Sequence, residues 1–214
     1  MQTIPAGARF DLTEAQCAVL EPLLPASTGR PPVHPRRRMI DGVRQRVRVG
    51  APWRDEPERY GPWQSVYTFC RRWQLAGAWA YLVTALQAVA NADGLITWDV
   101  QVDSTVVRAH QHAAGARRGP VVEGEPADRA LGRSRGGWTT KLHLSCEQGR
   151  KLMSLVLTGG QRGDSPQFIA VLERIRVPRL GSGRPRTRPD RVLAGKTPHA
   201  SIGQAASPWG AVDW

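Results

Sequence analysis

The chain of 214 residues is poor in cysteine, in lysine and in long hydrophobic runs. Its three cysteines, Cys17, Cys70 and Cys146, lie far apart and form no Cys-x-x-Cys pair, which argues against a disulfide framework and a zinc ribbon. No apolar run approaches the roughly 18 residues of a membrane-spanning helix, and the N-terminus lacks the pattern of a signal peptide. The expected location is therefore the cytoplasm.

Acidic residues are also scarce, with 18 Asp and Glu against 30 Lys and Arg, a net charge of +12 and a pI near 11. Only three of the 30 cationic residues are lysines, and the planar guanidinium suits phosphate better than a point charge does. A GC-rich coding bias explains the arginine excess equally well, but the charge acts on DNA in either case. A polyanionic partner is the first expectation.

Residues 1–92 are predicted to form a helical domain. Thr13 and Gln16 resemble a capping box at the start of a first helix, which Pro25 ends. A second helix over 36–49 has an arginine stripe beside its apolar stripe. The apolar stripe consists of Ile40, Val43 and Val47, and the arginine stripe of Arg37, Arg44 and Arg48.

The segment 55–75 is the most informative part of this domain. Val66, Phe69, Cys70 and Trp73 recur at i, i+3, i+4 and i+7, which predicts an amphipathic helix. A short helical piece and a turn at Gly61 precede it, so the unit resembles a helix-turn-helix. Its polar face carries groups able to meet base edges and phosphates, namely Gln64, Thr68, Arg71 and Arg72.

An ordinary core helix with a solvated polar face would give the same pattern. The preceding turn and the basic charge balance make a DNA-reading helix an equal alternative. An Ala-rich helix, roughly over 79–92, is expected to pack over this bundle.

From Ile96 the hydrophobic period changes from 3.6 to 2. Trp98, Val100 and Val102 alternate with polar residues and predict a strand, while 139–146 and 151–157 predict a hairpin. A helix follows, capped by Asp164 or Ser165, with Phe168, Val171, Leu172 and Ile175 on its apolar face, and then a short strand over 192–194. This order of strand, hairpin, helix and strand is typical of a ribonuclease-H-like core.

Such cores present carboxylates to divalent metals, and Asp103 is the obvious first ligand. Asp99 lies four residues away, about 13 Å along an extended strand, which is too far to share a metal ion. For an isolated aspartate, a strand-end turn or a helix cap is the favoured alternative. His110 and His112 are interpreted as polar loop residues rather than as a zinc site.

Several motifs of this sequence, in the expected order over residues 10–194, resemble bacterial insertion-sequence transposases of the DDE type. Five lie in the first half and resemble the family's N-terminal domain: Leu12–Gln16, Gly29–Pro32, Gly50–Asp55, Tyr60–Tyr67 and Arg71–Trp73. Three lie in the second half and resemble the start of its catalytic domain: Val102–His112, Gly132–Gly137 and Gly163–Phe168.

The resemblance implies a helix-turn-helix-like domain that binds element ends, followed by a ribonuclease-H-like domain whose Asp, Asp and Glu hold two Mg²⁺ ions. Asp103 matches the first catalytic aspartate and metal ligand. Arg133 and Arg135 lie in a matching motif and are added to the expected DNA contacts. The second aspartate belongs in a Val-Leu-Ala-Asp-Lys strand, where this chain has Gly195.

Residues 196–214 do not resemble the family and are expected to be a disordered tail. We interpret the abrupt loss of resemblance as a reading-frame change near position 195, so that 93–195 form an incomplete catalytic domain. The sequence therefore predicts a transposase that binds double-stranded DNA but is catalytically incomplete alone. The alternative is an end-binding regulator of transposition without catalysis, and a full-length transposase or a second copy is a further expected partner.

Overall fold

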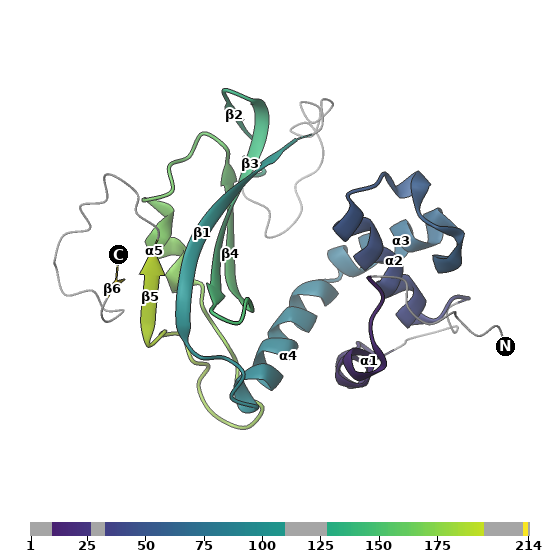
Figure 1. The fold of residues 1–214 in the computed structure, drawn as a ribbon, viewed down its shortest axis with the longest axis horizontal. Coiled ribbons are helices and arrows are strands. Elements are labelled where there is room, and N and C mark those ends of the chain that lie inside the picture. Colours follow the sequence, from purple (N-terminus) through teal and green to yellow (C-terminus); the bar gives the residue numbers. More distant parts are fainter. Residues whose placement is uncertain (1–9, 27–32, 110–127, 195–211, 214) are drawn as a thin grey trace. The chain divides into compact units, whose positions relative to one another are not determined.

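The computed structural model describes residues 10–26, 33–109, 128–194 and 212–213, and it combines helices at the N-terminal side with a following sheet (Figure 1). The chain divides into two compact units, Met1–Leu86 and Gln87–Trp214. The helical elements of the first part are α1 (Glu14–Leu20), η1 (Glu21–Leu23), α2 (Arg36–Val49), η2 (Trp53–Asp55), η3 (Glu58–Tyr60), α3 (Trp63–Leu75) and α4 (Ala78–Ala92). We call the first unit the head and the second the sheet unit.

The first helix begins as predicted, because the Thr13 hydroxyl accepts the Gln16 N–H while the Gln16 side chain accepts the Thr13 N–H. After Leu20 the helix tightens into the 3₁₀ turn η1, which contains Pro22. Proline has no N–H to donate to the preceding turn, which is why the regular α-helix does not continue.

The core of the head confirms the predicted apolar faces of α2 and α3, with one exception. Ile40 and Val43 are buried, as are Val66 and Phe69. Val47 continues the α2 stripe but is 66% exposed, which corrects the prediction. Burial in α2 is confined to its first half, between Met39 and Val43, so the last turn of the helix extends beyond the packed part.

The helix α4 spans the division between the two units. Ala78 and Leu82 belong to the core of the head, whereas Ala90 packs against the core of the sheet unit. Gln87 donates its side-chain amide to the carbonyls of Leu152 and Met153. The prediction that this helix simply packs over the helical bundle is therefore only half right.

After α4, the described residues of the sheet unit form a six-stranded sheet and the short helix α5. Its elements are β1 (Asp99–Arg108), β2 (Gly132–Ser134), β3 (Gly137–Glu147), β4 (Leu152–Gly159), α5 (Gln167–Glu173), β5 (Arg191–Ala194) and β6 (Val212–Asp213). β3 pairs antiparallel with β1 on one edge and with β2 and β4 on the other, while β5 is parallel to β1 and β6 to β5. The sequence did not predict β6, and the remainder of 196–214 lies outside the described residues.

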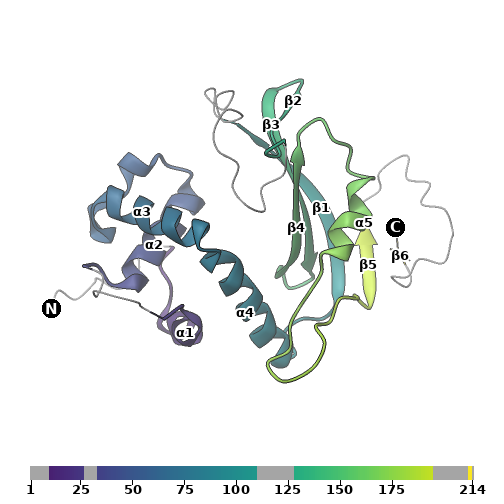
Figure 2. The same cartoon turned by 180° about the vertical axis from the view of Figure 1, so that it is seen from behind.

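The helix α5 covers one face of this sheet, as Figure 2 shows from behind. Its predicted apolar residues are all buried: Phe168, Val171, Leu172 and Ile175. The predicted alternation in β1 is confirmed for Val100, which is fully buried, but Trp98 precedes the strand with a left-handed φ of 62°. Its indole N–H donates to the Asn91 side chain, which anchors it in the core.

No single helix in the described ranges is both long and apolar enough to cross a membrane, and α3 and α4 reach those limits only as a pair bent by 72°.

Candidate nucleic-acid interface and carboxylate site

The exposed face of α3 brings four predicted DNA contacts together. Val66 and Trp73 point into the core, where the Trp73 ring lies 5.0 Å from that of Trp79. The opposite face is exposed and carries Gln64, Thr68, Arg71 and Arg72. Two apolar side chains, Tyr67 and Leu75, are exposed on the same side at 42% and 58%. The structure therefore places them as the helical periodicity predicts, from the first turn of the helix to its last.

The segment before α3 differs in detail from the predicted short helix. Residues Glu58–Tyr60 form a single 3₁₀ turn, and Gly61 follows with a φ of 102°. A side chain is strained at that dihedral, so glycine allows the sharp entry into α3. α3 starts directly after Pro62 without a side-chain cap.

The arginine stripe of α2 is largely occupied within the head. Arg37 donates to the Leu12 carbonyl and pairs with Glu14 at 2.7 Å, and Arg44 donates to the Phe10 carbonyl at 3.2 Å. Arg48, in the last turn, is exposed and has no ion pair within the described part of the chain. Of the three arginines in the stripe, Arg48 is thus exposed to solvent, whereas Arg37 and Arg44 attach the N-terminal segment to α2.

A buried carboxylate supports the same anchorage. Asp41 is 6% exposed and accepts the Leu12 N–H at 2.8 Å. Burial raises the pKa of Asp41, and the Leu12 hydrogen bond and Arg37 act against that rise. Periodicity missed this role, because the donors lie about thirty residues away along the chain.

A hollow of about 350 Å³ opens on the same surface as the exposed face of α3. Three apolar and three polar side chains account for most of its wall: Val33, Met39 and Phe69, and Gln64, Thr68 and Arg72. Three of the four predicted DNA contacts on α3 therefore border a hollow, which His34 and Ser65 also line and which the sequence pattern did not indicate.

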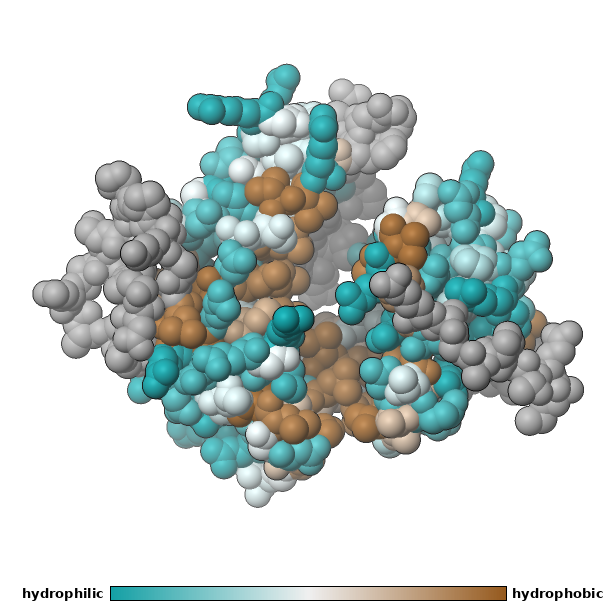
Figure 3. All heavy atoms as spheres, viewed as in Figure 1, coloured by the Kyte–Doolittle hydropathy of each residue, from teal (hydrophilic) through white to brown (hydrophobic). Residues whose placement is uncertain are grey.

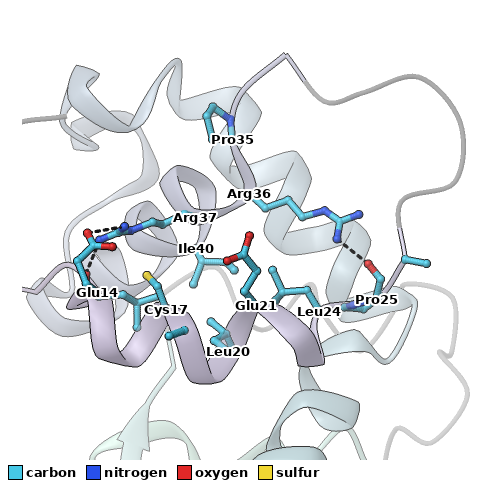
Figure 4. Close-up of a pocket in the computed structure, with 13 residues that line it drawn as sticks. Glu14, Cys17, Leu20, Glu21, Leu24, Pro25, Pro35, Arg36, Arg37 and Ile40 are labelled. Atoms are coloured by element: carbon cyan, nitrogen blue, oxygen red, sulfur yellow. Dashed lines mark hydrogen bonds and ion pairs between the residues drawn. The ribbon is translucent and has the colours of Figure 1, made fainter. Parts of the chain in front are cut away.

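A second hollow, of about 520 Å³, lies between α1, η1 and the start of α2 (Figure 4). Its wall is largely apolar, with Leu20, Leu24 and Ile40. The cations at its rim already have partners, since Arg36 donates to the Pro25 carbonyl at 2.6 Å and Arg37 pairs with Glu14. It contains none of the predicted α3 contacts, and its charge does not favour an anion.

In the sheet unit, Asp103 lies in the middle of β1 with its side chain exposed. Its Cα partner in β3 is Leu144, and its Oδ1 accepts the neighbouring Ser104 N–H at 2.7 Å. The same face continues over β4 with Leu155 and Leu157, which are 37% and 38% exposed. Figure 3, which views the side of the sheet away from α5, shows hydrophobic surface next to the polar residues along β1.

The parallel pairing of β1 and β5 is described up to the residue before Asp103. Its last described pair is Val102 and Ala194. In the sequence, the resemblance expects a second aspartate directly after Ala194, where the chain has Gly195. Residue 195 lies outside the described residues.

The described residues do not fit a two-magnesium centre. No group of three His, Cys, Asp or Glu side chains with metal-binding geometry occurs among them. Asp103 has leucines as its neighbours on β3 and β4, and Asp99 is four residues away on the same strand. The histidines His110 and His112 lie outside the described residues.

A polar cluster that the sequence did not reveal lies on the opposite face of the sheet. Asp164 pairs with Lys141 at 3.1 Å and lies 3.7 Å from Nδ1 of His143, whose Nε2 is 2.9 Å from the Thr158 hydroxyl. Burial lowers the pKa of His143, although Asp164 opposes this. Burial acts to raise the pKa of Asp164, but hydrogen bonds from Ser104 and Lys141 hold it below its ordinary value.

This cluster corrects the expectation that Asp164 caps the following helix. No side-chain cap is present at α5, and only the Asp164 carbonyl accepts, from the Gln167 N–H. The carboxylate instead ties the segment before α5 to β1 and β3.

The two remaining predicted contacts, Arg133 and Arg135, are exposed in the hairpin that joins β2 to β3. Arg133 pairs in register with Trp138, six residues along β3 from the partner of Asp103. At about 3.3 Å per residue this separation is roughly 20 Å. The structure therefore brings these arginines together with each other but not with Asp103.

Comparison with known proteins finds similarity to the head. The chain is 40% identical over 82 residues to the uncharacterized protein y4sN of Sinorhizobium fredii, and the match covers 38% of this chain and 62% of y4sN. No solved structure matches the chain. Residues 12–83 match the family model "Putative transposase of IS4/5 family (DUF4096)". The segment 12–83, which carries α1, α2 and α3, is therefore similar to transposases of the IS4/5 insertion sequences.

Proposed function

We propose that this chain is an insertion-sequence transposase that binds element ends through its head and does not cut or join DNA by itself. The observation that carries the proposal is the exposed face of α3, with Gln64, Thr68, Arg71 and Arg72 on one surface. No acidic residue occurs between Glu58 and Asp93, so no carboxylate on α3 repels a phosphate backbone. A helix of this kind fits the major groove, where amide and guanidinium groups meet base edges.

The sheet unit supports an incomplete ribonuclease-H-like catalytic domain as the second part of the proposal. β4, β3 and β1 are antiparallel neighbours, and β5 is added parallel to β1 after the helix α5, which is the arrangement expected for such a core. The described register of β1 with β5 ends at Val102 and Ala194, and the next residue in the sequence, where the resemblance expects the second aspartate, is Gly195. One carboxylate cannot hold the two metal ions of phosphoryl transfer.

The DNA-binding part of this proposal is tested with the full chain and a short DNA duplex. The duplex carries one end of the insertion sequence in which the gene lies. The affinity is expected to fall steeply and log-linearly with salt, because phosphate contacts release counterions. Arg71→Ala is expected to reduce discrimination between this duplex and a scrambled one. Arg48→Ala is expected to weaken binding to both duplexes equally. Binding that is insensitive to salt and to both substitutions would refute a DNA-binding head.

The catalytic half is tested by incubating the same duplex and the purified chain with Mg²⁺. No nicking is expected, and nicking by this chain alone would refute catalytic incompleteness. The nucleotide sequence after codon 194 provides a second test. An overlapping reading frame there that encodes Asp-Lys, preceded by a seven-nucleotide sequence on which ribosomes change frame, would support an enzyme made by ribosomal frameshifting.

The second candidate function is an end-binding regulator that competes with a full-length transposase. It is favoured by the combination of a well-packed head with Gly195 at the position of the second aspartate. Addition of this chain to a full-length transposase is then expected to reduce end cleavage, and the Arg71→Ala variant is expected to reduce it less.

A further inference from the structure

We propose that the hollow beside α3 receives the 5-methyl group of a thymine and that Gln64 reads an adenine at the same step, so that the head selects A·T-containing sequence there. This inference rests on the proposed DNA-binding function and names the base that the interface recognises. It starts from the apolar side chains that line a hollow beside the predicted DNA contacts of α3.

The apolar side chains of the hollow favour the binding of an apolar group. Val33, Met39 and Phe69 supply apolar wall, and Val33 is 87% exposed although it is a valine. The polar residues of the lining include His34 and Ser65, so the apolar contact surface is confined to the three apolar side chains. Burial of an apolar group against that surface is favourable. On the major-groove edges of DNA the one apolar group is the thymine methyl.

The polar residues at the rim of the hollow favour recognition of an adenine. Gln64 and Thr68 lie on successive turns of α3, and both border the hollow. A glutamine amide is complementary to the N6 and N7 edge of adenine, with which it forms two hydrogen bonds. Gln64 stands in the first turn of the helix, the part of a recognition helix that contacts base edges.

The charge of Arg72 and its distance from Gln64 favour a contact with a backbone phosphate. Arg72 also borders the hollow and lies eight residues after Gln64, about 12 Å along the helix axis. That span corresponds to roughly three to four base pairs at 3.4 Å each. Arg72 can therefore bind a backbone phosphate while Gln64 and the hollow meet one base step, and its positive charge complements the polyanion.

The test uses the full chain and a library of short duplexes with a randomised centre, from which bound sequences are selected. Each thymine of the selected duplex is then replaced in turn by uracil, which removes only the methyl group. One replacement is expected to weaken binding about fourfold, the factor that burial of a single methyl group contributes. Replacements elsewhere in the duplex are expected to leave the affinity unchanged.

Two variants connect that effect to the hollow. Val33→Ser is expected to abolish the thymine-to-uracil difference, whereas Val47→Ser, at an exposed valine of α2, is expected to retain it. Gln64→Ala is expected to relax the preference for adenine, with Gln101→Ala, at an exposed glutamine of β1, as the control. The exposed position of Val33 means that its substitution does not threaten the core.

The outcomes separate the two proposals. Absence of any salt-dependent duplex binding would overturn the DNA-binding function and this inference with it. Salt-dependent binding without a thymine-to-uracil difference, or with a difference that persists in Val33→Ser, would overturn this inference alone.

Discussion

Replacement of Glu56 by leucine is expected to stabilise the head at neutral pH. Glu56 is 7% exposed, and neither of its carboxylate oxygens has a hydrogen-bond partner within the described part of the chain. Its Oε1 lies against α2, 3.4 Å from the position that a Cβ on Gly42 would take. Burial raises the pKa of this carboxyl group, and Arg59 and Arg46 only partly oppose the rise.

The magnitude follows from the missing partner. An unsatisfied buried polar group costs about 1–3 kcal/mol, and a charged one more, so Glu56→Leu should gain at least about 1 kcal/mol at pH 8. Because the pKa is raised in the folded state, the penalty is complete above the folded pKa. It is relieved as the pH falls through that value, and it is absent below about 4.5, where both states are protonated.

The assay is urea unfolding of the full chain and of Glu56→Leu between pH 4.5 and 8, followed by hydrogen exchange in α2. The difference in unfolding free energy is expected to shrink steadily towards the acidic end. Glu56→Gln serves as the control, since it removes the charge but keeps a polar group in the same place. A difference that does not depend on pH, or a less stable leucine variant at pH 8, would refute the reasoning.

Three further substitutions test the packing of the two units. Thr13→Ala is expected to cost about 1 kcal/mol in the unfolding of the head, because it removes the capping box of α1. Gly160→Ala is expected to destabilise the sheet unit by about 1–3 kcal/mol, because the new Cβ would lie 1.8 Å from Thr139 Oγ1. Gly136→Ala is the control and should not change the stability, because the nearest atom to its new Cβ is 3.8 Å away. Glu147→Gln is expected to destabilise the sheet unit at pH 7 by about 2–3 kcal/mol. Although burial acts to raise the pKa of Glu147, hydrogen bonds from Gly149 and Lys151 lower it to about 2, so its contribution is present above pH 4.5 and lost as the pH falls towards 2. Thermal unfolding of each variant, with a pH titration for Glu147, provides the measurement, and unchanged stability in Gly160→Ala or a pH-independent loss in Glu147→Gln would contradict these assignments.

The sequence by itself determined the elements and their apolar faces. Helical periodicity located α2 and α3, and it placed Gln64, Thr68, Arg71 and Arg72 on one exposed surface. Alternation located β1 and the hairpin of β3 and β4. These signals are local, because a side chain three or four residues along a helix, or two along a strand, shares a face with the first whatever the rest of the chain does.

Tertiary structure decided which polar groups remain available. Arg37 and Arg44 lie on the arginine stripe that the sequence assigned to DNA. In the folded head they instead donate hydrogen bonds to backbone carbonyls of a segment about thirty residues earlier. The pairing of β5 with β1 likewise brought Ala194 beside Val102 across about ninety residues of chain. Contacts at such separations depend on how whole elements pack, so periodicity cannot reveal them, and the same holds for the apolar hollow that Val33 and Phe69 form beside α3.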